Sequence, residues 1–547
     1  MLWTPLLAIA SAAIAVEIPF FFFGTPSGHD LEFHLYSWLE VLSQWKQGIV
    51  YPRWAALAHF AYGEPRFVFY PPASWTLGAL LSTIFPWPGA SAVYIWIALV
   101  ASGVSMFLLT RRGLERPNAI FAAVLYAANP YHLVIVYWRS AFAELLASCL
   151  VPLLLLSVLK AVDEGRRAVF SRSIMPLALV LAAAWLTNAP AAVMIHYSLA
   201  LLLVFFAWRR RSSRPLLMGA AAVGLGALLS AFYLLPAIYE QRWINIAQAV
   251  SAGSRPEDNF LFIHTADADH DKFNRIISWV AVLEMGVIFA LAWMTRRWRE
   301  IQRELWDALF GWAVACSVLQ WAVSAVLWKV LPKMQFMQFP WRWLLCLSMI
   351  FSFFVASAFG AAGMRRWWWR AAVCAISMLV VVMAWHRIQP PWWDNAGDFR
   401  EMQDNMEDRV GYEGTDEYTP SGADPGALNN EKDKNVRSVT VAGPARAAIR
   451  VSRWDAESKM FTAEMSAPDQ LALRLFRYPA WQAKVNGRVV QTASTETGQM
   501  LVPVETGINR VQLTFTRTGD RVVGGWISLI ALMSVVVWNL RARRRPA

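Results

Sequence analysis

Long apolar runs separated by short arginine clusters constrain the fold of this chain more than any other feature. Hydrophobic residues make up 57% of its 547 residues and charged residues only 16%. Runs of about 20 apolar residues are long enough to cross a bilayer as helices. Thirty tryptophans suit the aromatic belts at the two membrane interfaces. The pattern predicts a polytopic α-helical membrane protein.

The basic residues indicate orientation rather than a nucleic-acid partner. The formal net charge is +12, but Arg and Lys lie in clusters between apolar runs, as is typical of cytoplasmic loops. The N-terminus lacks a basic region and a small-residue cleavage site, so we expect an uncleaved first helix. Both termini are then predicted to be cytoplasmic. The four cysteines lie inside apolar runs and predict no disulfide framework.

Placing each dense arginine cluster on one side predicts twelve crossings and one partial helix. Residues 72–86 are apolar but short and bounded by prolines, so we expect a partial, interfacial helix there. Asn188 and Pro190 divide one long apolar run into two short helices. The crossings are predicted at residues 2–23, 89–110, 118–137, 144–161, 174–208 (two), 215–237, 276–294, 306–328, 343–363, 371–385 and 522–540.

A hydrophilic segment near the C-terminus predicts a second domain. Its first half, residues 394–435, is rich in Asp, Glu, Asn and Gly and predicts loops. Its second half alternates apolar and polar residues and contains the hairpin signal Asn486-Gly487, so we expect a small β-sandwich. The predicted division is a transmembrane module at 1–386 with a first outer loop at 24–88, an outward-facing β-rich domain at 387–521, and a final helix with a basic tail at 522–547.

The first outer loop carries acidic and histidine side chains among aromatic ones. Asp30 follows the first helix closely, and partial burial would raise its pKa toward that of a general base. The alternative is a helix cap or an interfacial ion-pair partner. Glu32 and His34 share its face on a strand, whereas on a helix only His34 neighbours Asp30. We expect His34 to be a supporting hydrogen-bonding group rather than a metal ligand.

Four arginines on the outer side run against the orientation trend. The planar guanidinium matches phosphate oxygens, which favours a clamp on a phosphate or pyrophosphate. The alternative pairs them with local acids, Arg66 with Glu64 and Arg139 with Glu144. The four are Arg53, Arg66, Arg139 and Arg342.

Other polar residues predict little chemistry. His264 and the acidic run 267–271 offer oxygen ligands for a divalent cation, but a solvated loop is favoured because the run lacks EF-hand spacing. Glu17 and Glu284 lie within apolar runs and predict no role, and His132 and His196 are expected in the core. Nucleotide-binding and Gly-x-Ser-x-Gly motifs are absent from the sequence.

Several short motifs together resemble bacterial membrane proteins of the family labelled 6-pyruvoyl-tetrahydropterin synthase-related, a label that does not imply pterin chemistry. The motifs span nearly the whole chain. They are Gly28-His29-Asp30, Phe33-His34, Tyr51-Pro52-Arg53-Trp54, Tyr70-Pro71-Pro72, Asn129-Pro130-Tyr131-His132, residues 139–144, Gln338-Phe339-Pro340-Trp341-Arg342, and Tyr478-Pro479 with Trp481.

That family is similar to the GT-C superfamily of integral membrane glycosyltransferases. The resemblance implies a polyprenyl-linked sugar donor and an acidic base in the first outer loop, where Asp30 lies. The GT-C pattern often has two adjacent acids in this loop, whereas in this sequence one residue separates Glu32 from Asp30. Glu144 corresponds to an acid of the next outer loop. Some GT-C enzymes require a divalent cation such as Mg or Mn and others do not, so the metal stays open.

The resulting prediction is an inverting glycosyltransferase at the outer face of a bacterial inner membrane, acting without a soluble cofactor. Asp30 and Glu32 are the predicted catalytic residues, and Arg53, Arg139 and Arg342 bind the donor phosphate. His29, His34, Tyr70 and Glu144 are predicted to support them. The expected partners are the lipid-linked donor, membrane lipids, and a glycan, lipid or protein acceptor. The alternatives are a transporter or flippase of a lipid-linked saccharide, and a non-catalytic glycan assembly factor.

Overall fold

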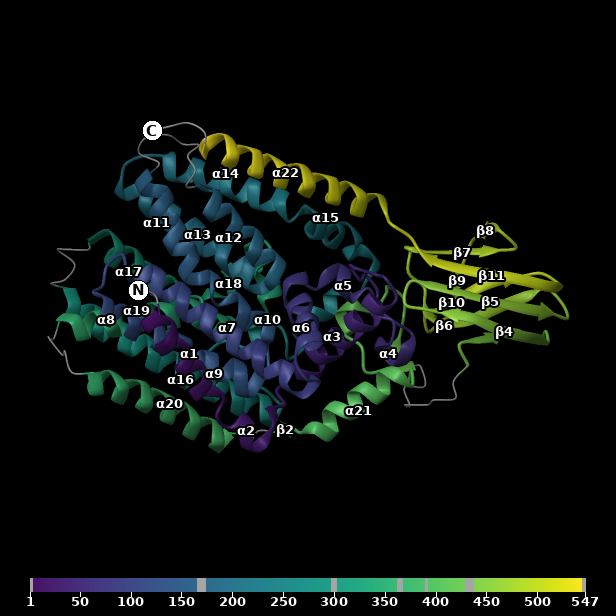
Figure 1. Cartoon of the computed structure of the whole chain (residues 1–547), viewed down its shortest axis with the longest axis horizontal. Helices are drawn as coiled ribbons and strands as arrows, with labels where there is room; N and C mark the ends of the chain where they lie inside the picture. Colours follow the sequence, from purple (N-terminus) through teal and green to yellow (C-terminus); the bar gives the residue numbers. More distant parts are fainter. Residues whose placement is uncertain are drawn as a thin grey trace.

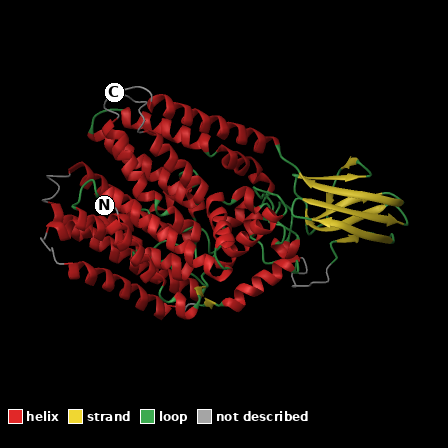
Figure 2. Cartoon of the chain, in the orientation of Figure 1, coloured by secondary structure: helices red, strands yellow, loops and turns green. Residues whose placement is uncertain are grey.

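Helices form one body of the molecule, and strands form a smaller domain at one end of it (Figure 1). A computed structural model describes residues 3–164, 174–296, 303–361, 367–388, 392–427 and 437–543. Figure 2 separates the two parts by secondary structure. The arrangement confirms the predicted class, a polytopic helical protein with a small β domain.

The helical body contains eight helical segments, within the described residues, that are long and apolar enough to cross a membrane. The number rises to ten if each of two bent helix pairs counts as one span. The eight are Trp3–Phe23 (α1–α2), Trp87–Thr110 (α7), Arg116–Arg139 (α8 to η1), Phe142–Asp163 (α10–α11), Ala189–Arg209 (α13), Ala268–Met294 (α16), Pro340–Gly360 (η8–α19) and Gly519–Leu540 (in α22). The bent pairs are α14 (Arg214–Leu229) with Ala231–Trp243, at 80°, and α17 (Arg303–Val318) with Ala322–Val330, at 91°.

The count of twelve full crossings is not confirmed, although all twelve predicted stretches contain helix. Helix α12 (Ile174–Thr187) has 14 residues, which rise about 21 Å against a hydrocarbon core of about 30 Å. Asn188 ends it, because its side chain caps the next helix by accepting the Ala191 N–H at 2.9 Å. Helix α20 (Trp367–Ile388) is not among the candidate spans. Helix α6 (Pro72–Ile84) forms where the partial helix was predicted.

The segment predicted as the first outer loop, residues 24–88, contains buried helix. Helix α3 (Leu31–Lys46) follows Asp30, and ten of its residues are buried. Its Trp38 stacks against Tyr94 of α7 and Phe142 of α10 (Phe142–Ala147). Asp30 therefore begins a helix that is anchored in the core of the body.

The acidic stretch after α20 also differs from the predicted loop. Helix α21 (Ala396–Glu407) begins with a capping box between Asn395 and Asp398. It buries Phe399 and Met402, and the Trp87 indole donates to the Phe399 carbonyl at 3.0 Å. The capping box offsets the poor helix propensity of this polar segment, which composition alone does not reveal.

The strand domain is a two-layer sandwich, as predicted. One sheet has the order β3-β6-β10-β9 and the other β4-β5-β11-β7-β8. Between β7 and β8, Asn486 (φ 49°) and Gly487 (φ 82°) both take the positive φ of a tight hairpin. The strands are β3 (Val439–Val441), β4 (Ala447–Trp454), β5 (Ser458–Met465), β6 (Asp469–Phe476), β7 (Trp481–Val485), β8 (Arg488–Val490), β9 (Ala493–Ser494), β10 (Gln499–Val504) and β11 (Gly507–Phe515).

A buried ion pair joins the sandwich to the body. Glu240, at the end of α15 (Ala231–Glu240), accepts two hydrogen bonds of 2.6 Å from Arg521 in α22 (Gly519–Arg543). The Tyr478 hydroxyl of the sandwich donates to the same carboxylate at 2.5 Å. All three side chains are buried, so the pair fixes the position of the last helix beside the sandwich.

Candidate active site

The backbone of residues 28–30 packs directly on a π-helical turn, η1 (Ile135–Arg139). The Asp30 N–H donates to the Arg139 carbonyl at 2.8 Å, and the His29 N–H donates to the Trp138 carbonyl at 3.2 Å. Residue 28 has to be glycine, because a Cβ there would lie 2.6 Å from the Arg139 carbonyl carbon. The two segments thus bring Asp30 to Arg139 across more than a hundred residues of sequence.

Two arginines share one buried carboxylate at the centre of the site. Glu144 Oε2 lies 2.5 Å from Arg139 Nη1 and 3.2 Å from Arg342 Nε. The Tyr131 hydroxyl donates to the other oxygen, Glu144 Oε1. All four side chains are buried. The pairing of Arg139 with Glu144 that the sequence suggested is present, and Arg342 joins it.

Asp30 forms the accessible edge of this cluster. Its Oδ2 lies 3.7 Å from Arg139 Nη2, and its Oδ1 lies 2.7 Å from His29 Nδ1. The Asp30 side chain is 32% exposed and that of His29 is 89% exposed. Asp30 occupies the N-cap position of α3 but makes no side-chain cap hydrogen bond. The carboxylate is therefore an ion-pair partner rather than a cap.

The pKa of Asp30 moves in the direction opposite to the prediction. Burial acts to raise it, but the hydrogen bond with His29 and the charges of Arg139, His29 and His34 together hold the pKa well below its usual range. The prediction from partial burial was wrong because it counted desolvation and omitted the cations that only the fold brings near. Asp30 is ionised throughout the neutral range.

The neighbouring His34 and Tyr70 are neutral. Burial lowers the pKa of His34 to about 4, with Arg66 and Arg139 acting in the same direction. Burial raises the pKa of Tyr70 well above its usual value, and the charge of Asp30 adds to the effect. His34 stacks on Phe142 at a centroid distance of 5.1 Å, and its Nδ1 has no hydrogen-bond partner in the described chain. Both side chains line the cluster as uncharged polar groups.

The motif at 338–342 is a third chain segment that contacts the cluster. Arg342 Nη1 donates to the Met337 carbonyl at 2.6 Å and to Gln338 Oε1 at 3.1 Å. The Arg139 guanidinium carbon lies 5.0 Å from the centroid of the Trp341 ring. We did not predict Gln338, Trp341 or Tyr131 as site residues from the sequence. Each of them lies in a motif that resembles the family, and those motifs could have pointed to them.

Two predicted site residues lie apart from this cluster. Arg53 stacks on the Tyr51 ring at 3.8 Å. Burial lowers its pKa, and the charges acting on it include those of Arg521, Glu457 and Glu240. Glu32 is exposed in the first turn of α3, and its charge acts on Asp394. The structure thus groups Asp30, His29, His34, Tyr70, Arg139, Glu144 and Arg342, and leaves Arg53 and Glu32 outside.

The residues of the cluster do not fit a divalent cation. Glu144 already accepts from two arginines and a tyrosine, which leaves Asp30 as one carboxylate beside a guanidinium. Across the described ranges, no three His, Cys, Asp or Glu side chains are grouped to hold a metal ion. In the acidic run 267–271, Asp267 caps α16 and Asp271 bonds His264 at 3.0 Å.

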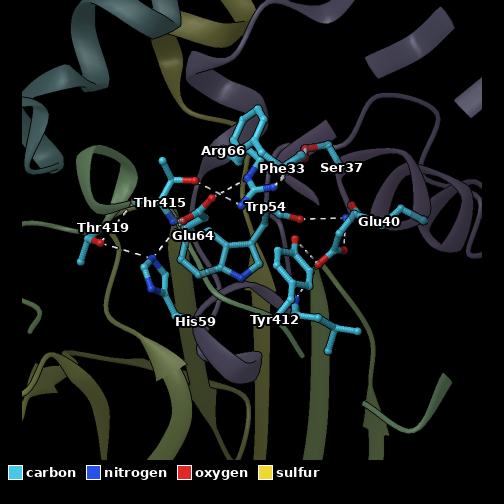
Figure 3. A network of polar contacts seen from close by, with 12 residues as sticks. Phe33, Ser37, Glu40, Trp54, His59, Glu64, Arg66, Tyr412, Thr415 and Thr419 are labelled. Atoms are coloured by element: carbon cyan, nitrogen blue, oxygen red, sulfur yellow. Dashed lines mark hydrogen bonds and ion pairs between the residues drawn. The ribbon is translucent and has the colours of Figure 1, made fainter. Parts of the chain in front are cut away.

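A second arginine–carboxylate network lies beside α3 (Figure 3). Glu64 accepts from Arg66 Nε at 2.5 Å, lies 2.9 Å from His59 Nε2 and accepts from the Thr415 N–H at 2.8 Å. The side chains of Glu64, Arg66 and His59 are at most 4% exposed. Arg66 therefore pairs with Glu64, as the alternative reading of the sequence proposed.

Comparison with known proteins places the chain in a family. Residues 67–389, which are 323 of 547, match the family described as "6-pyruvoyl-tetrahydropterin synthase related domain; membrane protein". This range contains Arg139, Glu144 and Arg342. No curated protein matches the chain.

Solved structures give weaker likenesses. The apo oligosaccharyltransferase of Archaeoglobus fulgidus is 13% identical over 75% of this chain and 56% of its own, with a TM-score of 0.43. ArnT from Cupriavidus metallidurans, bound to undecaprenyl phosphate, is 12% identical over 75% and 70%, with a TM-score of 0.46. AglB from Archaeoglobus fulgidus, in complex with an inhibitory peptide and a dolichol-phosphate, is 13% identical over 76% and 60%, with a TM-score of 0.43.

At TM-scores below 0.5 none of these structures assigns an activity to the chain, and the chain spans less than two thirds of the oligosaccharyltransferases it matches. The family match stands independently of them, since it covers more than half of the sequence. The helical body and its several apolar spans agree with that description. The protein is a multi-pass membrane protein of the 6-pyruvoyl-tetrahydropterin synthase-related family.

Proposed function

We propose that this protein is a membrane glycosyltransferase. It moves a sugar from a polyprenyl-phosphate-type donor to an acceptor on the outer side of a bacterial inner membrane. The observation that carries the proposal is the position of Asp30, an ionised and partly exposed carboxylate 3.7 Å from an arginine that shares Glu144 with a second arginine. A base and a phosphate-binding pair thereby adjoin one another.

The charge balance of the cluster suits transfer from a phosphate. Arg139 and Arg342 carry two positive charges against one negative charge on Glu144, which leaves one positive charge for Asp30 to neutralise. When Asp30 takes a proton, that positive charge becomes available to the departing phosphate. Cations held in place before the reaction stabilise developing negative charge effectively.

The proposed step is a single displacement with inversion. The acceptor oxygen bonds to the anomeric carbon as its proton passes to Asp30, and the bond from that carbon to the phosphate oxygen breaks. The polyprenyl phosphate leaves with the electron pair, next to Arg139 and Arg342. Because Asp30 has a low pKa, it is a weak base, so the proton transfers as the new bond forms rather than before it. His34 and Tyr70 offer neutral hydrogen-bonding groups to sugar hydroxyls.

The test uses purified protein in nanodiscs with a panel of radiolabelled polyprenyl-phosphate sugars and a cell extract that supplies acceptor. We expect wild-type protein to release the lipid phosphate and Asp30→Asn to bind the donor without turnover. Glu413→Gln, an exposed acid outside the cluster, serves as the matched control and should turn over normally. Normal turnover by Asp30→Asn would contradict the assignment of the base.

A transporter or flippase of a lipid-linked saccharide is the second candidate, because two features favour it. Two helix pairs bend by 80° and 91° between their halves, and broken helices are common at transporter sites. Glu284 lies buried within the span Ala268–Met294, and the Ser348 hydroxyl lies 3.0 Å from its Oε1. Carboxylates in such positions often serve ion or substrate pathways.

Lipid-linked sugar movement across sealed vesicles separates the two candidates. A transporter would lose movement in Glu284→Gln and keep it in Asp30→Asn, whereas a transferase would release lipid phosphate only with Asp30 intact. A non-catalytic assembly factor would tolerate both substitutions, and it would show neither activity.

A further inference from the structure

The outward face of the larger sheet of the sandwich carries a group of arginines and a lysine. Burial alternates along β5 and β11, so Phe461, Ala463, Val511 and Leu513 face the core while their neighbours face out. Strand pairing places Arg450 beside Thr462, and Thr462 beside Arg510. Three adjacent strands thus present Arg450 and Arg510 on one side, about 10 Å apart at the strand spacing.

Lys484 extends this group to a fourth strand. It pairs with Gln512 on β11, two residues from Arg510 on the same face, so the two cations are diagonal neighbours about 7–8 Å apart. Arg450, Lys484 and Arg510 form no ion pair within the described residues, whereas Arg453 nearby is paired with Asp455 at 3.0 Å. The only acid facing out among them in the paired strands is Glu464, opposite Ala448 and Ile508. We call Arg450, Lys484 and Arg510 the basic face.

The basic face contrasts with the acidic segment that precedes the sandwich. Residues 394–427 contain 10 acidic and 2 basic residues, whereas residues 437–518 contain 6 acidic and 11 basic residues. Helix α21 of this segment packs on α3 and α7 of the helical body, and within the described residues no acid of the segment forms an ion pair with the basic face. An anionic ligand is repelled by one region and attracted by the other.

We propose that the basic face binds an anionic glycan. Thr462 and Gln512 lie between the cations, and Gln482 and Thr514 continue the same face beyond Lys484; all four side chains can bond to ligand hydroxyls and carboxylates. No aromatic ring lies on this face of the paired strands, which argues against a base-stacking nucleic-acid surface. The strands lie beyond the ends of the spanning helices (Figure 1), so a bilayer around those helices does not reach the face.

The role of that glycan rests on the proposed function: the glycan bound at the basic face is the sugar acceptor, and it carries carboxylate or phosphate groups. Binding of the glycan to the basic face does not depend on that function. A flat face with separated charges recognises a repeating anionic chain better than a single small anion, because several weak contacts act together.

The test measures binding of oligogalacturonate, a carboxylated glycan, to full-length protein in phosphatidylcholine nanodiscs. We expect binding that weakens with salt, and a loss of about tenfold or more in the triple variant Arg450→Gln, Lys484→Gln, Arg510→Gln. The matched control neutralises three exposed arginines of the same domain that lie off this face: Arg437→Gln, Arg477→Gln, Arg488→Gln. Its affinity should stay within about twofold of wild type.

Each other result overturns the proposal. An equal loss of affinity in the control variant would mean that the domain attracts anions through its overall charge. Equal affinity for neutral maltooligosaccharide would mean that the charge of the glycan does not contribute to binding. Tighter binding of polyglutamate or of phosphatidylglycerol vesicles would identify an acidic peptide or a lipid surface instead. Asp30→Asn should bind the glycan as wild type does. Wild-type protein that binds the glycan but transfers no sugar would refute the proposed function alone.

Discussion

Two buried arginine–carboxylate networks flank α3, and they differ in how they end. In the network of Glu64, His59, Arg66 and the Thr415 N–H occupy both carboxylate oxygens. The side chains of Glu64, His59 and Arg66 are at most 4% exposed, so none of them is open to a ligand (Figure 3). The network of Glu144 continues through Arg139 to Asp30, which is 32% exposed. A closed network holds two chain segments together, whereas an open one offers charge to a ligand.

The closed network should give the largest effect on stability. Glu64→Gln leaves Arg66 buried without its counter-charge, so we expect a loss of about 3–5 kcal/mol in the free energy of unfolding. Chemical unfolding in detergent micelles measures it. The double variant Glu64→Met, Arg66→Met removes both charges and should recover much of the loss. If the single variant were as stable as wild type, the network would not hold the fold.

The open network should show the opposite profile. Asp30→Asn removes a partly exposed charge and should cost less stability than Glu64→Gln, but the proposed base is lost, and transfer should fall by about 10² to 10⁴-fold. Turnover of a polyprenyl-phosphate sugar and thermal unfolding of the same sample measure the two effects. Strong destabilisation with unchanged turnover per folded molecule would make Asp30 a structural residue like Glu64.

Gly28→Ala tests the backbone contact that places Asp30. The added Cβ would lie 2.6 Å from backbone atoms of Arg139 and Ser140, so the segment has to shift, at a cost of about 1–3 kcal/mol. We expect a smaller loss of turnover than in Asp30→Asn, measured with the same substrates. Gly89→Ala, whose Cβ would meet no atom within 4 Å, is the matched control and should behave as wild type.

The smallest effect concerns pH. The folded pKa of Asp30 lies below its unfolded value of about 3.9. The stabilisation it gives is therefore complete above that unfolded value and is lost only as pH falls toward the folded one. Between pH 5 and 8 we expect turnover to lack an acid limb from Asp30. The hydrogen bond and the charge of Asp30 raise the pKa of His29, so the stability that wild type gains over Asp30→Asn should be complete below the unfolded pKa of His29, about 6.5, and should fall as pH rises through its raised folded value. A stability difference that stays constant across this range would show that Asp30 does not hold the charge of His29.

Local patterns in the sequence were sufficient for much of the fold. The positions of the spans follow from apolar length, and the hairpin at Asn486-Gly487 follows from turn chemistry, because both depend on a few neighbouring residues. The same applies to the alternation that forms β11. Helix α21 was missed, since its capping box outweighs a composition that is typical of loops.

The sequence by itself determined that this is a multi-pass membrane protein with a small β-sandwich, and motif resemblance indicated Asp30, Arg139, Glu144 and Arg342. Only the tertiary structure decided which of the arginines meet at one carboxylate, and that Arg53 and Glu32 lie elsewhere. It also decided the pKa of Asp30, which partial burial alone would have raised. The physical reason is distance along the chain: Arg139 reaches Asp30 through backbone packing at Gly28, and local sequence carries no record of a charge that folding brings near.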